Sequence, residues 1–525
     1  MTVARLLKST LSAPVIAIGC GLLGAVLSAV LLLGDLLIHR IGEIEYGQIS
    51  HVVHAIAKYL PVVLGIGGFF SAFTTRAQIS AVFGSARWAT DKDLKALSTR
   101  DDGLLIGRDP KTARLLRYDG PAHLMTIAPT RTGKGVGTII PNLLTADRSV
   151  ICIDPKGENT RITGRARAQF GPGHILDPFG VTGKHSSAFN PLDGLKPDSL
   201  DIAEDANTLA DALVFDEPGM AGEAHWNEEA KALIAGLILF TIVAEPPGRR
   251  HLGTLREHLT LSPQRFADLL VHMQDMVEAG GLIARAANRH LGKSDREAAG
   301  VLSAAQRHTH FLDSPRITAV LDRSDFRFAD LKRNNATVFL VLPPDRLSTY
   351  SRWLRLLITQ SLTDMARETA SPARPVLYLL DEFAALGHLA PVERAMGLMA
   401  GYGVQLWPIL QDIHQLRSTY GQRAGTFLSN AAVLQVFGVN DVETAGLIAR
   451  SIGKTDAHYV TRSRSEGKTS SSEHISARDL INADEVMRLP ADRMILLRQG
   501  QRPAWVEKLR YYADPEFRGM FDRAR

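Results

Sequence analysis

Short apolar runs recur along the chain from about residue 76 onwards, and stretches with helical spacing of apolar positions lie between many of them. Most runs are near-continuous in Val, Ile and Leu, which is typical of strands that are covered on both faces. Such strands predict a doubly wound α/β fold with a mostly parallel sheet, helices on both faces and a ligand site at the carboxyl ends of the strands. The predicted strands are HLMTIA, SVICID, HILDPF, ATVFLVLP, VLYLLDEF, VQLWPILQ, VLQVFGVN and RMILLRQG.

The series of strands is interrupted at residues 195–322, where the sequence has no convincing strand pattern. Segments such as DIAEDANTLADALV and NEEAKALIAGLILFTIV have helical spacing. We therefore predict an all-helical inserted domain at 195–322 that divides the sheet domain into parts 76–194 and 323–525. Residues 198–229 hold ten acidic residues and no Lys or Arg, which leaves open a solvated helical face or a docking surface for a protein partner.

Two apolar runs precede the α/β part. Residues 11–34 contain no charged residue, and a helix of that length spans about 36 Å, enough for the core of a bilayer. The second run, 59–75, is marginal in length unless it extends back through Val52 and Val53 to give a span of 52–75. Lys and Arg lie before the first run and after the second, so we expect a two-helix membrane anchor over residues 1–75, with the N-terminus and the main body in the cytoplasm. A cleaved signal peptide or a buried hairpin are the alternatives for the first run.

Composition and charge narrow the function only slightly. A chain of 525 residues is too long for one compact core, so two or three domains are expected. The net charge of +5 mildly favours polyanionic partners without establishing one. The only two cysteines, Cys20 and Cys152, exclude a disulfide framework and a zinc site, which fits a reducing compartment.

The stretch MTIAPTRTGKGVGTIIPNLL, residues 125–144, departs at both ends from the common phosphate-binding loop. That loop has Gly, four residues, Gly-Lys and then Ser or Thr, whereas this chain has Ala128 and Gly135 at the outer positions. Strand-like sequence precedes the loop and helix-like sequence follows it, so backbone N–H groups and a helix N-terminus would face an anion. We predict that ATP is bound by Thr130, Arg131, Thr132, Gly133, Lys134, Gly135 and Val136, with Lys134 also acting in catalysis.

Acidic and amide side chains end two of the other predicted strands. Asp381 and Glu382 follow the apolar run 375–380, where adjacent carboxylates are costly unless positive charge or water meets them. A Mg²⁺–phosphate cluster would do so, with Asp381 holding the metal and Glu382 polarising the attacking water. Gln411 ends the next strand and would sense the γ-phosphate or orient water. A capped helix after Asp381 and an ordinary turn at Gln411 are the alternatives.

Further motifs are spread over nearly the whole chain. They are GSARWAT, APTRTGKGVG, DPKGE, FNPL, VFLVLPPDRL, LDEFAALGHL, QDIHQLRSTYG, GVNDVETAGLIARSIGK and LINADEVMRLPADRMILL. Together they resemble type IV secretion coupling proteins, the TraG-like membrane ATPases of conjugative DNA transfer. The resemblance implies a P-loop, RecA-like nucleotide domain with ATP and Mg²⁺ as cofactors, and a homohexamer in the bacterial inner membrane. It also implies nucleoprotein (relaxase) or effector substrates, DNA bound without sequence specificity, and delivery to a type IV secretion channel.

The resemblance bears on the unusual loop. Gly-Lys-Gly is frequent in one large branch of the family, so Gly135 does not imply a dead site. Because Gly135 has no hydroxyl for Mg²⁺, we predict that water and Asp381 complete its coordination, with Thr132 as the alternative and Thr138 too far away.

The arginine that some relatives place between the acidic strand and the Gln strand is not assigned. Arg394 is the only arginine in that stretch, and Arg417, Arg423 and Arg450 are other candidates.

Two other functions stay open at this stage. A non-hydrolysing docking receptor would use nucleotide only to shape a ring, and a chromosome-segregation DNA translocase would usually have more spans, a long linker and a C-terminal DNA-reading domain.

The Ser- and Thr-rich stretch at residues 459–476 predicts a mobile loop, in which Arg462, Arg464 and Lys468 would contact a DNA backbone or solvent.

Overall fold

The computed structural model divides the chain into two units, Met1–Val82 and Phe83–Arg525, which are considered separately. It describes residues 22–34, 36, 47–74, 82–99, 101–214, 224–465 and 468–523.

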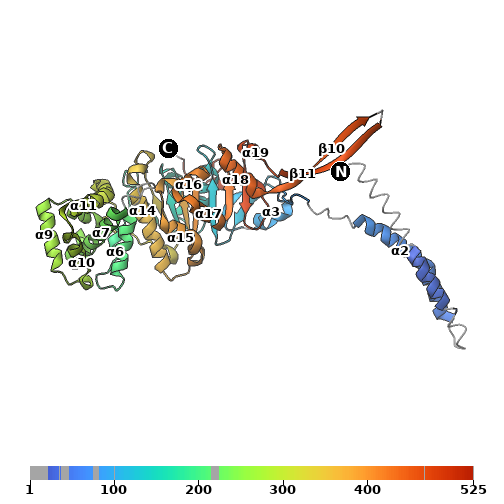
Figure 1. The fold of residues 1–525 in the computed structure, drawn as a ribbon, viewed down its shortest axis with the longest axis horizontal. Helices are drawn as coiled ribbons and strands as arrows, with labels where there is room; N and C mark the ends of the chain where they lie inside the picture. Colours follow the sequence, from blue (N-terminus) through green and yellow to red (C-terminus); the bar gives the residue numbers. More distant parts are fainter. Residues whose placement is uncertain are drawn as a thin grey trace. The chain divides into compact units, whose positions relative to one another are not determined.

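The larger unit is organised around one eleven-stranded sheet, shown in Figure 1. Its strand order is β2-β1-β13-β12-β9-β3-β8-β7-β4-β6-β5. The run from β9 to β5 is parallel throughout, whereas β12, β13, β1 and β2 pair antiparallel at one side. The strands are β1 Leu104–Arg108, β2 Leu115–Tyr118, β3 His123–Ile127, β4 Val150–Ile153, β5 Gly173–Leu176, β6 Thr337–Leu340, β7 Val376–Leu380, β8 Val404–Leu410, β9 Ala431–Val436, β12 Arg493–Arg498 and β13 Ala504–Glu507.

The predicted mostly parallel α/β fold is confirmed, because each of the eight apolar runs contains a strand of this sheet. The central strands are buried on both faces, as continuous runs of Val, Ile and Leu require. RMILLRQG forms β12, which pairs antiparallel with β9 and so begins the antiparallel side of the sheet. The short strands β1, β2 and β13 were not predicted, since LLIGR, LLRY and AWVE give too few apolar positions.

Helices surround the sheet. Those near the sheet are α3 Asp91–Ser98, η1 Gly135–Ile139, α4 Ile140–Thr145, α5 Glu158–Arg167, α14 Pro344–Arg367, η7 Phe383–Leu386, α15 Ala390–Leu398, α16 Ile413–Tyr420, α17 Ala424–Asn430, α18 Val442–Ile452 and α19 Ala483–Met487. Between β5 and β6, the described residues contain helices and no strand: α6 Ile202–Leu213, α7 Ala224–Ala244, α8 Leu252–Leu259, α9 Pro263–Gln274, α10 Leu282–Leu291, α11 Asp295–Thr309, α12 Pro315–Thr318 and α13 Asp330–Arg333. The domain limits at 195 and 322 stay a prediction.

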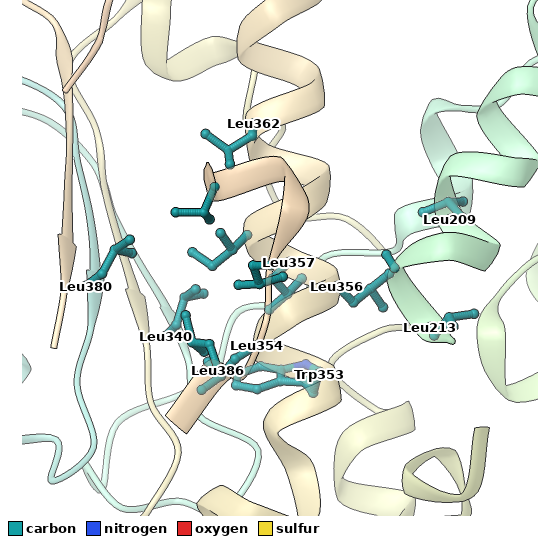
Figure 2. Packing of buried hydrophobic residues seen from close by; sticks show 14 of the residues in the cluster. Leu209, Leu213, Leu340, Trp353, Leu354, Leu356, Leu357, Leu362, Leu380 and Leu386 are labelled. Atoms are coloured by element: carbon teal, nitrogen blue, oxygen red, sulfur yellow. The ribbon is translucent and has the colours of Figure 1, made fainter. Parts of the chain in front are cut away.

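Helix α14 connects the sheet to this group of helices. Figure 2 shows Leu340 and Leu380, at the ends of β6 and β7, on one side of α14, and Leu209 and Leu213 of α6 on the other. Trp353 and its leucine neighbours on α14 are fully buried between them. Because close-packed side chains transmit displacement, α14 links the positions of the helical segment and of the strand ends.

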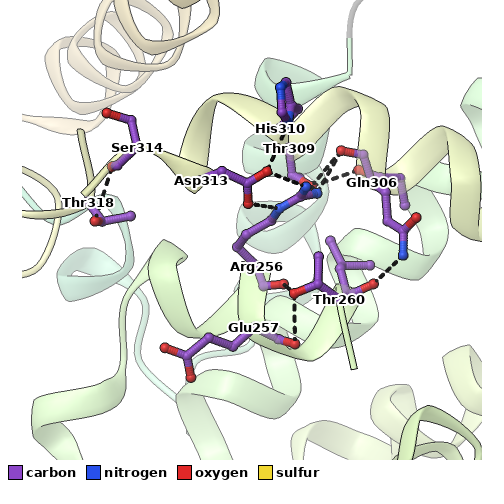
Figure 3. A network of polar contacts seen from close by, with 11 residues as sticks. Arg256, Glu257, Thr260, Gln306, Thr309, His310, Asp313, Ser314 and Thr318 are labelled. Carbon is purple, nitrogen blue, oxygen red and sulfur yellow. Dashed lines mark hydrogen bonds and ion pairs between the residues drawn. The ribbon is translucent and has the colours of Figure 1, made fainter. Parts of the chain in front are cut away.

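A polar network holds α8 against the C-terminal end of α11, shown in Figure 3. The Arg256 guanidinium pairs with both carboxylate oxygens of Asp313, with Nε–Oδ1 at 2.6 Å and Nη2–Oδ2 at 2.8 Å. Its Nη1 donates to the Gln306 carbonyl at 2.7 Å and to Thr309 Oγ1 at 3.0 Å. A bidentate arginine of this kind is a structural contact that holds the two helices together.

The N-terminal unit contains helix α2, Gly47–Thr74, and residues 22–34 are also helical. In the part of the chain that the structure describes, none of the helices combines the length and the apolarity needed to cross a membrane. Residues 11–21 of the first predicted span, and Thr75 of the second, lie outside the described residues.

The predicted mobile loop at residues 459–476 was wrong for most of its length. Strands β10, Lys454–Ser465, and β11, Lys468–Asp479, form an antiparallel hairpin paired from Lys454↔Asp479 to Ser465↔Lys468. Ser-rich composition suggested a loop, but a ladder of backbone hydrogen bonds needs no apolar face. The side chains of Arg462, Arg464 and Lys468 lie outside the described set, so their contact with DNA stays a prediction.

Candidate nucleotide-binding site

The predicted phosphate loop lies between β3 and the short π-helix η1. Arg131 has φ +67° and Gly133 has φ +94°, both in the left-handed region. Alternating handedness of this kind turns successive backbone N–H groups toward one side, which forms a concave anion site. The Thr132 N–H and hydroxyl both donate to the Pro129 carbonyl, at 3.2 Å and 2.6 Å, and fix the turn. Thr130 to Gly133 lie in this loop, Lys134 precedes η1, and Gly135 and Val136 open it.

Three strand ends bring four of the predicted residues into contact. Lys134 Nζ lies 2.9 Å from Asp381 Oδ1 and 2.6 Å from Glu382 Oε1. Gln411 Nε2 donates to Glu382 Oε2 at 3.1 Å. The sheet order explains the meeting, because β8 lies between β3 and β7 and all three are parallel. Their carboxyl ends therefore present Lys134, Gln411 and the two carboxylates at one edge.

Burial and charge differ between the two carboxylates. The side chain of Asp381 is 13% exposed and that of Glu382 is 31% exposed, so Glu382 is the one more open to water. Burial raises the pKa of Asp381, although the Lys134 ammonium opposes that effect. Burial also lowers the pKa of Lys134, but both carboxylates together outweigh it and the net pKa is raised. Together, the Lys134 ammonium and the two carboxylates carry one net negative charge. Such a cluster suits a site that receives a divalent cation with phosphates.

The donor set agrees with Mg²⁺ shared with a nucleotide. Carboxylate oxygens are hard ligands, and Mg²⁺ is usually held by one or two of them with phosphate oxygens and water. Within the described residues, no group of three His, Cys, Asp or Glu side chains could hold a metal by itself. Asp381 and Glu382 offer the one or two carboxylates that Mg²⁺ usually takes from a protein when it binds together with phosphates.

The backbone of Glu382 adopts a conformation that non-glycine residues rarely take, with φ +50° and ψ +41°. Such a conformation costs on the order of 1–3 kcal/mol and is enriched at functional sites. It turns the Glu382 side chain to Lys134 and Gln411 and away from the course of β7. Residue identity alone gives no sign of this backbone conformation.

Two nearby hydroxyl groups, those of Thr132 and Thr138, already donate hydrogen bonds inside the protein. Thr138 Oγ1 is buried and donates to Gln435 Oε1 at 3.1 Å, which also accepts from Thr126 Oγ1 at 2.8 Å. Thr138 therefore has its donor committed inside the core. A Cβ at Gly135 would meet nothing within 4 Å, so space does not explain the missing Ser or Thr at that position.

A second positive side chain beside the loop was not predicted. Lys508, which directly follows β13, donates from Nζ to the Thr132 carbonyl at 3.2 Å and lies 4.4 Å from the ring centre of Phe437. Burial lowers the pKa of Lys508 to about 8. Lys508 thus links the C-terminal part of the sheet to the phosphate loop. No motif surrounds it in AWVEK, so only the fold reveals it.

Replacing Lys508 with Met should change how stability depends on pH. In the wild type the folded lysine loses its proton near pH 8, whereas an unfolded lysine keeps it to about pH 10.4. The unfolded state then binds more protons between these values, so the free energy of unfolding rises with pH there. Lys508→Met should raise the melting temperature at pH 7 and remove the rise between pH 8 and about pH 10. The melting temperature measured between pH 7 and about pH 10 tests this prediction, with Lys92→Met at an exposed position as the matched control. If the melting temperatures of the wild type and of Lys508→Met changed equally with pH, the prediction would be contradicted.

The arginine candidates stay unassigned. Arg417 pairs with Glu443, and Arg423 lies 3.3 Å from Glu393. Arg394 is exposed on α15, and Arg450 lies in the last turn of α18. Among the contacts of the described residues, none joins these arginines to Lys134, Asp381 or Glu382.

Comparison with known proteins gives the family. A profile of the family described as Type IV secretory system Conjugative DNA transfer matches residues 87–523. The chain belongs to this family. The resemblance drawn from its motifs is thereby confirmed, and the functional class is conjugative DNA transfer by type IV secretion.

Individual members of the conjugative DNA-transfer family are similar over most of their length. The conjugal transfer protein TraG of Escherichia coli is 28% identical over 494 residues, which cover 83% of this chain and 77% of that protein. Protein VirD4 of Agrobacterium fabrum is 29% identical over 463 residues, covering 84% of this chain and 67% of that protein.

Solved structures show a similar fold. The bacterial conjugative coupling protein TrwBdeltaN70, unbound, has a TM-score of 0.65 at 18% identity, covering 82% of this chain and 93% of that one. The plasmid coupling protein TrwB in complex with ADP and Mg²⁺ has a TM-score of 0.63, also at 18% identity, covering 82% and 94%. At this identity the likeness establishes the fold.

Proposed function

We propose that the chain is an ATPase that uses Mg²⁺ and ATP to drive DNA or nucleoprotein substrates into a type IV secretion channel. The observation that carries the proposal is the contact of Lys134 with Asp381 and Glu382, with Gln411 on the second carboxylate. A cation, a metal-binding acid, a water-polarising acid and an orienting amide are the parts that phosphoryl transfer from ATP requires. TrwB, the relative of similar fold, was solved with ADP and Mg²⁺, which supports the choice of nucleotide.

The residues divide the work as follows. When Lys134 turns to the outer phosphates, Glu382 Oε1 loses its partner and becomes available to accept a hydrogen bond from the attacking water. Gln411 keeps Glu382 in place through Oε2 during this exchange. Asp381, the more buried carboxylate, would hold Mg²⁺, whose charge stabilises the phosphates in the transition state.

The remaining parts of the proposal concern assembly and location. We propose a homohexamer in the bacterial inner membrane, anchored by two spans near residues 11–34 and 52–75, with the main body in the cytoplasm. The apolar, uncharged run and the distribution of Lys and Arg support the anchor. DNA would be held through its backbone without sequence specificity, for which a net charge of +5 is suitable.

A non-hydrolysing receptor is the second candidate, because Gly135 removes the hydroxyl that usually contacts Mg²⁺. In that case nucleotide binding would shape the assembly and another protein would supply the energy.

Replacing Gly135 with Ser tests the Mg²⁺ coordination. We expect turnover at limiting Mg²⁺ to rise about tenfold, which corresponds to about 1.4 kcal/mol, because the new hydroxyl would supply a ligand that water now provides. The substitution is sterically free. ATP hydrolysis as a function of Mg²⁺ concentration measures the effect, and turnover at saturating Mg²⁺ is the control. An unchanged Mg²⁺ dependence would mean that another side chain already fills the position.

Crosslinking of cargo in cells tests the transport function. A chain with a photoreactive residue should crosslink to transferred DNA or to the nucleoprotein, and Lys134→Ala should hold the cargo without passing it to the recipient. If Lys134→Ala passed cargo to the recipient at the wild-type level, transport would not depend on ATP turnover by this chain.

A further inference from the structure

A cavity of about 460 Å³ lies where the helical segment meets the sheet part of the fold. Helices α6 and α7 form one side, and α14 with the beginning of α15 forms the other, the same junction that Figure 2 shows packed around α14. This volume is within the range of sites for small molecules. We name it the junction cavity; its polar lining includes Asp211, Lys231, Arg355, Thr359, His388 and Arg394.

Among the described residues that line the junction cavity, positive side chains outnumber negative ones. They are Lys231, Arg355 and Arg394, against the single described acid Asp211. Asp211 is itself 3.3 Å from Lys231, which also pairs with Glu228 at 2.8 Å. Arg394 forms no ion pair with any residue that the structure describes, and it is exposed. The described lining therefore has an excess of positive charge that suits an anion.

A buried hydroxyl adds a second, independent observation. Thr359 lines the junction cavity, is 4% exposed, and its Oγ1 has no hydrogen-bond partner among the described residues. Helical threonines usually satisfy this group locally, as Thr363 does by donating to the Thr359 carbonyl at 3.0 Å. A buried polar group without a partner is costly unless a ligand or water supplies one.

The junction cavity is connected to the nucleotide site by a short segment. Residues 383–389 run from Glu382 to the cavity wall at His388 and Leu389. Arg355 Nη1 holds this segment by donating to the carbonyls of Leu386 and His388, at 2.7 Å and 2.8 Å. An anion that attracts the Arg355 guanidinium would compete with these hydrogen bonds and shift the backbone that follows Glu382.

We propose that the junction cavity binds a small polyanion bearing phosphate or carboxylate groups, and that its occupancy changes ATP turnover through Arg355 and residues 383–389. Arg394 and Arg355 supply the charge, and Thr359 supplies a hydroxyl. The binding of the polyanion is independent of the proposed function, whereas its effect on ATP turnover rests on that function.

Binding is measured with the full-length chain carrying Lys134→Ala, because this variant weakens the phosphate loop as a competing site. Titration calorimetry with pyrophosphate and, separately, with succinate should show one site per chain. Adding Arg394→Glu should weaken that binding at least tenfold, whereas Arg296→Glu, the same change on an exposed part of α11, should leave it within twofold. If only pyrophosphate binds, the ligand carries phosphate groups, and if only succinate binds, it carries carboxylate groups. Binding of both probes shows that the site recognises the negative charge that the two groups share.

Thr359→Val separates a ligand role from a structural one. Because valine has the same shape without the unpartnered hydroxyl, the melting temperature should stay equal or rise while binding weakens about threefold. Absence of binding by both probes, or binding that Arg394→Glu does not weaken, overturns the site.

The turnover half uses chains with an intact Lys134. Whichever probe binds in the calorimetry, succinate or pyrophosphate, should change the ATP turnover of the wild type more than that of Arg394→Glu. If the probes bind and turnover does not respond, the link to the nucleotide site is wrong. If the chain hydrolyses no ATP, the proposed function fails together with this link, and the binding result still decides the site.

Discussion

Replacing Glu382 with Gln is expected to lower the rate of ATP hydrolysis by about a hundredfold to ten-thousandfold, the range typical for loss of a positioned acid–base group. Glu382 is the more exposed of the two carboxylates at the end of β7, and Gln411 holds one of its oxygens at 3.1 Å. Gln has the same shape, so the backbone at φ +50° and the contact with Gln411 can persist while the charge that polarises water is lost. Lys134 keeps Asp381 as its partner, so nucleotide should still bind.

Phosphate release measures the rate of hydrolysis, and titration with a fluorescent ATP analogue measures nucleotide binding separately. Glu257→Gln, the same chemical change on the exposed face of α8, is the matched control and should match the wild type. Undiminished hydrolysis by Glu382→Gln would show that another group activates the water.

Replacing Lys134 with Ala is expected to abolish hydrolysis and to weaken ATP binding at least about tenfold, since a hydrogen bond to a charged group contributes about 1.5–3 kcal/mol. Unlike Glu382→Gln, this change removes the contact with the outer phosphates and therefore affects binding as well as chemistry. It also leaves Asp381 and Glu382 without their shared cation, so the pKa of Asp381 should rise further and the folded state should be less stable.

Titration calorimetry with ATP and thermal unfolding measure these effects. The double variant Lys134→Ala with Asp381→Asn serves as control, because removing the stranded carboxylate should recover part of the melting temperature without restoring hydrolysis. If Lys134→Ala binds ATP with wild-type affinity, the loop does not contact the phosphates in the proposed way.

The central site could be predicted from the sequence because its residues stand at the ends of recognisable strands. HLMTIA, VLYLL and VQLWPIL are apolar enough to be read as buried strands, and parallel strands place their carboxyl ends together. Lys134, Asp381, Glu382 and Gln411 therefore had to lie at one edge, and the structure joins them within 3.1 Å.

Other features depend on contacts that no local pattern encodes. Lys508 reaches Thr132 because β13 and β12 extend the sheet beyond β9, a pairing that AWVEK does not indicate. The left-handed backbone of Glu382 follows from its surroundings and not from its residue type. The hairpin β10–β11 is held by its own backbone ladder, so its polar sequence resembled that of a loop.

The junction cavity likewise required the fold. Its arginines, Arg355 and Arg394, lie on two helices, and Lys231 comes from a third that is more than a hundred residues away. Sequence spacing could list these residues only as scattered charges.

The most direct test of the account is steady-state phosphate release from Mg²⁺–ATP by the purified full-length chain, with and without DNA. The account predicts hydrolysis by the wild type that falls to background in Lys134→Ala. Nucleotide binding without hydrolysis under either condition would contradict the account and favour the docking receptor.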